Sequence, residues 1–152
     1  MRRLPLLLIG LGIVAFLAIS SLLARAWNAE GAERSAITAL VAAEARGDTA
    51  AAVDRLQDCQ DDRACQAVTA RLSGQLRRPG RIAILQLQPS TGFSLTATTG
   101  TARVAWNTSS SVLPVVQCVR VHRAGDVIRG LRIELLAITP RLRSDSDCPR
   151  SF

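Results

Sequence analysis

The chain opens with an uninterrupted apolar run and then changes to amphipathic patterns. Positions 4–24 hold no charged residue and are dominated by Leu, Ile, Val and Ala. At ~1.5 Å rise per residue, a helix of this length crosses roughly the ~30 Å hydrocarbon core of a bilayer. Arg2 and Arg3 precede the run, so the positive-inside rule places the N-terminus in the cytoplasm and the remainder outside. We therefore predict a transmembrane anchor at 1–27 that meets the lipid bilayer through residues 4–24.

Two other readings of this segment stay open at the level of sequence. The triplet Ala24-Arg25-Ala26 has small residues at the spacing of a signal-peptide cleavage site, although the apolar run is longer than the ~7–15 residues of a usual signal core. The run is also compatible with a buried core helix. Trp27 lies just beyond the run and fits either the membrane interface, where Trp is enriched, or the core of the next domain.

The segment after the anchor begins with an Ala-rich amphipathic pattern over about 29–46. One face of this predicted helix carries Ile37, Leu40, Val41 and Glu44. Gly47 followed by Asp48 is typical of a glycine that ends one helix and a cap that starts the next.

Two further helices follow in the pattern. The second is short and turns Val53 and Leu56 inward. The third comes after a corner at Cys59 and ends at Arg77-Arg78-Pro79-Gly80. Its inward positions recur at i, i+4 spacing, namely Ala64, Val68, Leu72 and Leu76.

From Arg81 the period changes to that of strands. A strand over 82–88 ends at Pro89. Phe93, Leu95 and Ala97 then alternate with polar residues, and Gly100 marks a turn. Ala102, Val104 and Trp106 alternate in a middle strand that leads to a polar loop over 108–111.

Two long strands, 112–123 and 127–139, are predicted to meet at the loop Ala124-Gly125-Asp126. This loop pairs Val119 with Leu131 and Val121 with Arg129. One face of the hairpin is then apolar and forms core, with Val115, Val119, Val121, Leu131, Ile133 and Leu135. The other face is mixed and cationic, and its candidate binding residues are Arg120, His122 and Arg132.

The four cysteines indicate an oxidising compartment, because an even count in an exported domain is typical of two disulfides. Three pairings are open. The favoured one joins Cys59 to Cys65 across a polar helix corner and Cys118 to Cys148, which staples the polar tail 141–152 to a strand. That tail would lie over Arg120 or Arg132, with Asp145 and Asp147 offsetting their charge.

Composition narrows the function classes. The net charge is +7, and residues 77–152 alone hold 11 Arg against four acids. Such a positive charge suits binding to nucleic acid or to anionic lipid. Nucleic acid is not an expected partner, because the domain is predicted to lie outside the cytoplasm and because a 3% aromatic content provides few rings for base stacking. One His and no CxxC motif leave no metal site, and no phosphate-binding loop is present. No cofactor is expected.

The order of three helices followed by four or five antiparallel strands resembles the nuclear transport factor two-like superfamily over roughly residues 29–140. The resembling stretches are Ala45-Arg46-Gly47-Asp48-Thr49 at the first helix junction, Gly100-Thr101-Ala102-Arg103-Val104, and the hairpin that starts at Val119. The resemblance implies an α+β domain at 28–140 in which three helices pack on a curved antiparallel sheet, often with a pocket at the open end of the cone.

Function is predicted mainly by elimination, because this fold serves many unrelated activities. Enzymes of this superfamily use a pocket Asp, Tyr or His; Tyr is absent here, and no acid–base pair stands out. We therefore expect a non-catalytic, membrane-anchored binding or assembly module in the bacterial cytoplasmic membrane, with a protein partner or a homodimer contact through the sheet face. The alternatives are a ligand-binding or enzymatic cone and a scaffold subunit of a secretion or conjugation machine, which shares the layout of an N-in helix plus such a domain.

Overall fold

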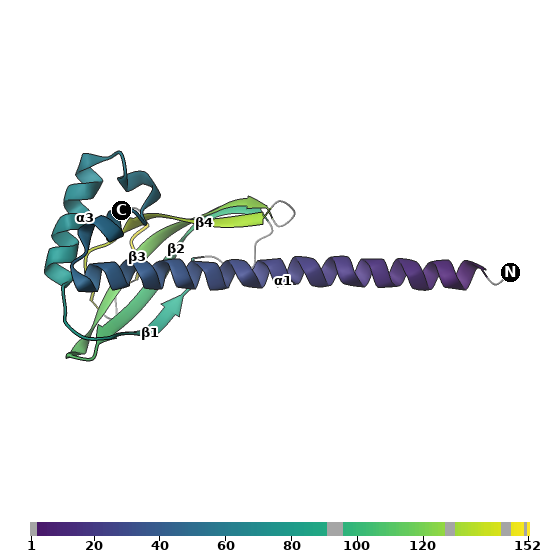
Figure 1. The fold of residues 1–152 in the computed structure, drawn as a ribbon, viewed down its shortest axis with the longest axis horizontal. Helices are drawn as coiled ribbons and strands as arrows, with labels where there is room; N and C mark the ends of the chain where they lie inside the picture. The colour runs from purple at the N-terminus through teal and green to yellow at the C-terminus, as the bar shows by residue number, and fades with distance from the viewer. Residues whose placement is uncertain (1–2, 91–95, 127–129, 144–146, 151) are drawn as a thin grey trace.

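A computed structural model of the chain describes residues 3–90, 96–126, 130–143, 147–150 and 152 (Figure 1). The helices are α1 (Arg3–Arg46), α2 (Thr49–Val53), the 3-10 turn η1 (Gln57–Cys59) and α3 (Arg63–Leu76). The strands are β1 (Ile82–Gln88), β2 (Thr96–Thr108), β3 (Ser111–Asp126) and β4 (Gly130–Ile138), paired antiparallel in the order β1-β2-β3-β4. The α+β class is as predicted, with four strands in the described part of the sheet.

Helix α1 joins the predicted anchor and the predicted first domain helix into one uninterrupted helix of 44 residues. Its N-terminal half stands clear of the domain, and its C-terminal half packs along the sheet (Figure 1). Leu11 and Phe16 are each 68% exposed, so the reading of the run as a buried core helix is wrong. Trp27 is 73% exposed, which also excludes its placement in the domain core. This helix is long and apolar enough to cross a membrane.

The junction after α1 follows the sequence pattern. Gly47 has a φ of +72°, the left-handed conformation that glycine adopts without strain at the end of a helix. The Asp48 carboxylate accepts a hydrogen bond from the backbone N–H of Ala51 at 3.1 Å and so caps α2. Leu56 is buried as predicted, and Val53 is half-buried.

The predicted inward face of α3 is correct at two of its four positions and wrong at the other two. Leu72 and Leu76 are buried, but Ala64 is exposed and Val68 is 40% exposed. An i+4 step advances about 400° around a helix, so a strict i+4 series drifts by about 40° per step and cannot stay on one face for long. The inner face begins instead at Cys65 and Thr69, which contact the preceding corner.

Gly100 lies inside β2 rather than at a turn, so that prediction is wrong. It pairs with Val121, and the ladder with β3 continues on both sides of it. Long-range pairing with β3 therefore overrides the local turn signal of a glycine between polar residues. The predicted alternation at Phe93 and Leu95 lies outside the described residues. The polar loop at 108–111 is confirmed as a tight turn closed by the Thr108–Ser111 pair.

The β3–β4 hairpin is longer than predicted. Strand β3 runs on through 124–126, Val121 pairs with Leu135 rather than Arg129, and the connection falls on 127–129, outside the described residues. Gly125 has a φ of +91°, and a Cβ there would lie 2.4 Å from the carbonyl oxygen of Gly130. This glycine therefore permits a close approach between strands instead of making the turn.

The predicted β3–β4 register is wrong, but it assigns the side chains of both strands to the correct faces of the sheet. At Val121 the observed register differs from the predicted one by six positions, and an even shift keeps the paired side chains on the same side of the sheet. A bulge between Arg120 and Val121 adds one further position, so Val119 pairs with Ile138. The inner face packs against α1, α2 and α3 in one core around Trp106. The predicted core residues of the hairpin that are buried there are Val115, Val119, Val121 and Leu135, whereas Leu131 and Ile133 are half-buried.

Candidate functional site

The cationic face lies on the outer side of β3 and β4. Arg120 and His122 are neighbours on that side of β3, and both are half-buried, whereas Arg132 on β4 is exposed. The His122 Nδ1 lies 3.0 Å from the Thr99 hydroxyl, and Glu134 stands opposite His122 in the ladder. The structure therefore places the three predicted residues on one face, next to a carboxylate that partly offsets their charge.

The C-terminal tail covers this face with an aromatic ring. The guanidinium of Arg120 lies 4.9 Å from the centroid of the Phe152 ring, a cation–π geometry. The sequence predicted acidic cover instead: Asp145 lies outside the described residues, and Asp147 is exposed. The Arg120 guanidinium is thus partly shielded from solvent by the Phe152 ring.

A disulfide and backbone hydrogen bonds hold the tail in place. Cys118 is bonded to Cys148 with their Cα atoms 5.7 Å apart, the predicted pairing. The Leu142 N–H donates to the Val116 carbonyl at 2.7 Å, and the Cys118 N–H donates to the Thr139 hydroxyl at 2.9 Å. Residues 139–142 therefore continue along the edge of β3 beyond the end of β4, and the disulfide holds Cys148 against Cys118.

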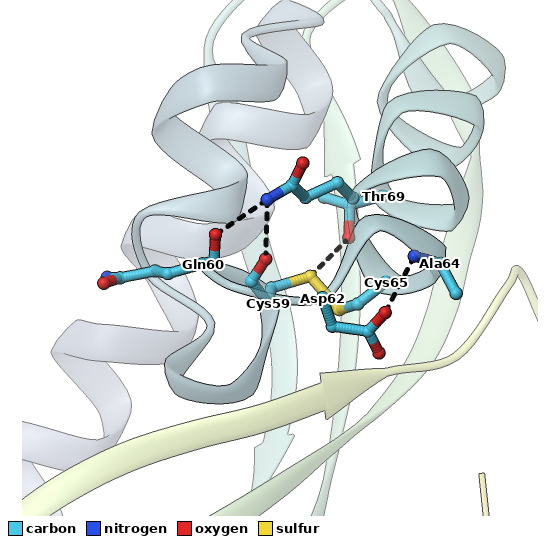
Figure 2. The surroundings of a disulfide bond; sticks show 7 residues. Cys59, Gln60, Asp62, Ala64, Cys65 and Thr69 are labelled. Atoms are coloured by element: carbon cyan, nitrogen blue, oxygen red, sulfur yellow. Dashed lines mark hydrogen bonds between the residues drawn. A yellow bond between two sulfur atoms is a disulfide. The ribbon is translucent and has the colours of Figure 1, made fainter.

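The second predicted disulfide locks the corner between η1 and α3 (Figure 2). Cys59 and Cys65 are bonded with their Cα atoms 5.1 Å apart. The Gln66 amide donates to the carbonyls of Cys59 at 3.1 Å and Gln60 at 2.8 Å, and the Thr69 hydroxyl lies 3.4 Å from the Cys59 sulfur. These contacts satisfy the polar backbone of a tight corner, which indicates a structural role.

An ion pair lies buried between α1 and β3. The Arg123 guanidinium donates to the Oε2 atom of Glu33 at 2.7 Å and 3.0 Å, and their side chains are 4% and 0% exposed. The other Glu33 oxygen accepts the backbone N–H of Ser90 at 2.6 Å. The Glu33 carboxylate therefore joins α1 both to β3 and to the segment that follows β1.

A second buried carboxylate lies deeper in the domain, where α1 crosses the sheet. The Gln117 amide donates to Glu44 Oε2 at 2.9 Å and to the Thr139 carbonyl at 3.1 Å, while its own oxygen accepts from the Trp106 indole at 2.8 Å. The other oxygen of Glu44 has no hydrogen-bond partner in the described structure. Burial raises the pKa of Glu44 to about 7, and the hydrogen bond from Gln117 limits the rise.

We expect this carboxyl to make the domain less stable as the pH rises. Its pKa is about 7 in the folded protein against 4.5 for the ordinary group, so the stabilising protonated form is fully present below pH 4.5 and is lost as the pH rises to about 7. The shift corresponds to about 3 kcal/mol of unfolding free energy. Urea denaturation of the full chain in detergent micelles at pH 5 and pH 8 measures it.

The matched variants separate this carboxyl from the others. Glu44→Gln keeps the shape of the side chain and an oxygen that accepts the hydrogen bond from Gln117, but it does not titrate. The decrease in unfolding free energy between low and high pH should therefore be smaller by about 3 kcal/mol in this variant. Asp58→Asn changes an exposed carboxyl and should leave the pH dependence as in the wild type. A wild-type pH dependence in Glu44→Gln would contradict the assignment.

The residues that bind these carboxylates were not among the predicted site residues. Arg123 and Gln117 share the odd parity of Val119 and Val121 on β3, which was sufficient to place them on the inner face. Glu33 precedes Ile37 by one helical turn on the buried stripe of α1. Strand parity and helical period therefore indicated that these residues are buried, whereas their polar side chains indicated that they are exposed to solvent.

The aspartates around the helix corner serve as caps or face solvent. Asp48 caps α2, and Asp62 caps α3 by accepting the Ala64 N–H at 2.8 Å. Asp54, Asp58 and Asp61 are exposed. Within the described ranges, no group of three or more His, Cys, Asp or Glu side chains is arranged to hold a metal ion.

Surface hollows lie over the described helices and strands. One, of about 710 Å³, lies between α2 and α3 over Ala50, Val53, Ala67 and Ala70. A second, of about 510 Å³, adjoins the start of β1 and the β2–β3 turn. The third, of about 280 Å³, lies beside β4 and has Asp54, Arg55 and Glu134 among its lining residues. All three lie on the outside of the domain, away from Glu44.

No family model matches this chain, and no match was found among curated proteins or solved structures. The resemblance to the nuclear transport factor two-like superfamily therefore stays a prediction.

Proposed function

We propose that this protein is a single-pass membrane protein, with its N-terminus in the cytoplasm, whose exported α+β domain is a non-catalytic binding or assembly module. The continuity of α1 carries the proposal: one helix presents an exposed apolar surface over its first half and forms the domain core with its second. Two disulfides fit an oxidising compartment on the outer side of the membrane.

The coupling between anchor and domain supports an assembly role. Glu33 lies nine residues after Ala24, so its buried pair with Arg123 is roughly 14 Å along the helix from the end of the apolar run. No hinge separates the two, because α1 is helical throughout. The domain is therefore held at a fixed height above the bilayer, which suits a subunit that must meet neighbours in one orientation. A subunit of a secretion or conjugation machine is one such case.

The interior supports a binding module over an enzyme. A raised carboxyl pKa is typical of acid–base groups, but Glu44 is 0% exposed and its enclosing partners are Gln117 and core side chains. A substrate atom would have to displace the core to reach it. The surface residues of the sheet and helices are therefore the candidates for contact with a partner.

Reporter fusions test the topology. A reporter that is active only outside the cytoplasm, fused after Phe152, should be fully active, and one that is active only in the cytoplasm should be inactive. The variant with Arg2→Ser and Arg3→Ser lacks the flanking charge and should insert partly in the opposite orientation, which lowers the signal of the outside reporter. Activity of the cytoplasmic reporter on the unaltered chain would overturn the proposal.

A further inference from the structure

Strand β1 forms one edge of the sheet. Its neighbour is β2, and no other strand in the described part of the chain pairs with its far side. The opposite edge differs, because Leu56 forms a bridge to Leu135 in the middle of β4. The two edges of the sheet are therefore not equivalent, and β1 is the open one.

The backbone of β1 turns hydrogen-bonding groups outward. The Ser109 N–H donates to the Arg81 carbonyl at 3.0 Å, and the register continues with Ile82 opposite Thr108. Because hydrogen-bonded and non-hydrogen-bonded pairs alternate in an antiparallel ladder, Ile82 and Ile84 form non-hydrogen-bonded pairs with β2. Their N–H and C=O groups consequently point away from the sheet.

The side chains of this edge favour a further strand. Residues 82–88 include no charge and no proline, the usual features that prevent edge pairing, and only the bulge at Leu85 interrupts the strand. The inner-face side chains Ile82, Ile84 and Leu87 pack against the core yet are only half-buried. An added strand would bury these side chains further and would also pair the outward backbone N–H and C=O groups of Ile82 and Ile84.

A second copy of the chain does not fit this edge when both copies are anchored in one membrane. Two identical strands that pair antiparallel in one sheet are related by a two-fold axis perpendicular to the sheet. Helix α1 lies along a face of the sheet (Figure 1), so this axis would reverse its direction. Two anchors in a shared bilayer with the same orientation must instead be parallel.

We propose that the open edge of β1 binds an extended, uncharged segment of a different protein as a fifth antiparallel strand, with alternate apolar side chains continuing the inner face. This inference rests on the proposed role as a binding module and names the kind of partner. Affinity comes from the outward backbone groups of Ile82 and Ile84, and selectivity comes from side chains that pack beside the half-buried residues of β1.

Hydrogen exchange on the full chain in detergent micelles tests whether the edge is open. The amides of Ile82 and Ile84 should exchange at least tenfold faster than that of Ala83, whose N–H faces β2. Slow exchange at both isoleucines would show that the chain itself covers the edge, and this would overturn the inference. Such a result would leave the membrane topology, measured by the reporters, unaffected.

A peptide probe tests the occupant. A labelled synthetic peptide with the uncharged sequence of residues 82–88 carries no anchor, so the symmetry restriction does not apply, and it should slow exchange at Ile82 and Ile84. The same peptide with N-methyl groups on alternate residues loses the backbone donors of one edge and should bind about tenfold more weakly. Micelles without protein correct for partitioning of the peptide.

Two lysine variants complete the test. Leu85→Lys places a charge on the open edge and should weaken peptide binding at least tenfold. Leu113→Lys changes a residue of similar exposure, 65% against 55%, on β3 and should bind as the wild type does. Equal binding by the N-methylated and unmodified peptides, or by the two lysine variants, would overturn the proposal, as would disulfide crosslinking of two Leu85→Cys chains in one membrane.

Discussion

Replacing Arg123 with methionine is expected to lower the free energy of unfolding by about 3–5 kcal/mol. The substitution removes the guanidinium bonds at 2.7 Å and 3.0 Å, so the buried Glu33 carboxylate keeps its hydrogen bond from the Ser90 N–H but loses the opposite charge. A buried charge without its partner is far more costly than the same pair is stabilising. Urea denaturation of the full chain in micelles gives the value.

A double variant identifies the cause. Glu33→Gln with Arg123→Met removes both charges but keeps an oxygen that accepts the Ser90 N–H, so most of the lost stability should return. Arg132→Met removes an exposed arginine from the same hairpin and should change stability by less than about 0.5 kcal/mol. If the double variant were as unstable as Arg123→Met alone, the loss would come from packing and not from the uncompensated carboxylate.

Removing the Cys118–Cys148 bridge should cost about 3–4 kcal/mol. The bond joins positions 30 apart in the sequence, and the chain-entropy model assigns about this value to a loop of that length. The variant with Cys118→Ser and Cys148→Ser should therefore melt roughly 10 °C lower than the wild type under oxidising conditions. It should also free Phe152 from Arg120.

The comparison needs a background without the other bridge. In chains that carry Cys59→Ser and Cys65→Ser, full reduction should abolish the difference between the bridged and unbridged forms. Peptide mapping of the unreduced protein shows the connectivity directly. A peptide that links Cys118 to Cys59 or Cys65 would contradict both the pairing and the path of the tail.

Local signals predicted the parts of the fold that depend on a few neighbouring residues. Gly47 and Asp48 end one helix and cap the next, and Pro89 ends β1, because each acts through its own backbone conformation or side chain. The Cys59–Cys65 pairing followed from the same kind of local argument, whereas the Cys118–Cys148 bond joins positions 30 apart in the sequence. The outer-face position of Arg120 and His122 followed from their parity along β3, which does not depend on the register with β4.

The remainder depends on contacts between distant segments. Gly100 and Gly125 read as turns, but pairing with β3 and β4 places both inside strands. The burial of Glu33 and Glu44 depends on Arg123 and Gln117, which lie 90 and 73 positions away in the sequence. These pairs form only when the sheet packs on α1, so a reading of neighbouring residues could not predict the two buried carboxylates and their partners.

The intact mass of the chain, purified from the membrane fraction without reductant, tests the central claim most directly. Membrane anchoring predicts a chain that retains Arg2 and Arg3 and whose mass is lower than that of the reduced chain by two hydrogen atoms for each of its two disulfides. A mature chain that begins at Trp27 and is recovered in the soluble fraction would show that the apolar half of α1 is a cleaved signal peptide, and would contradict the proposed anchor.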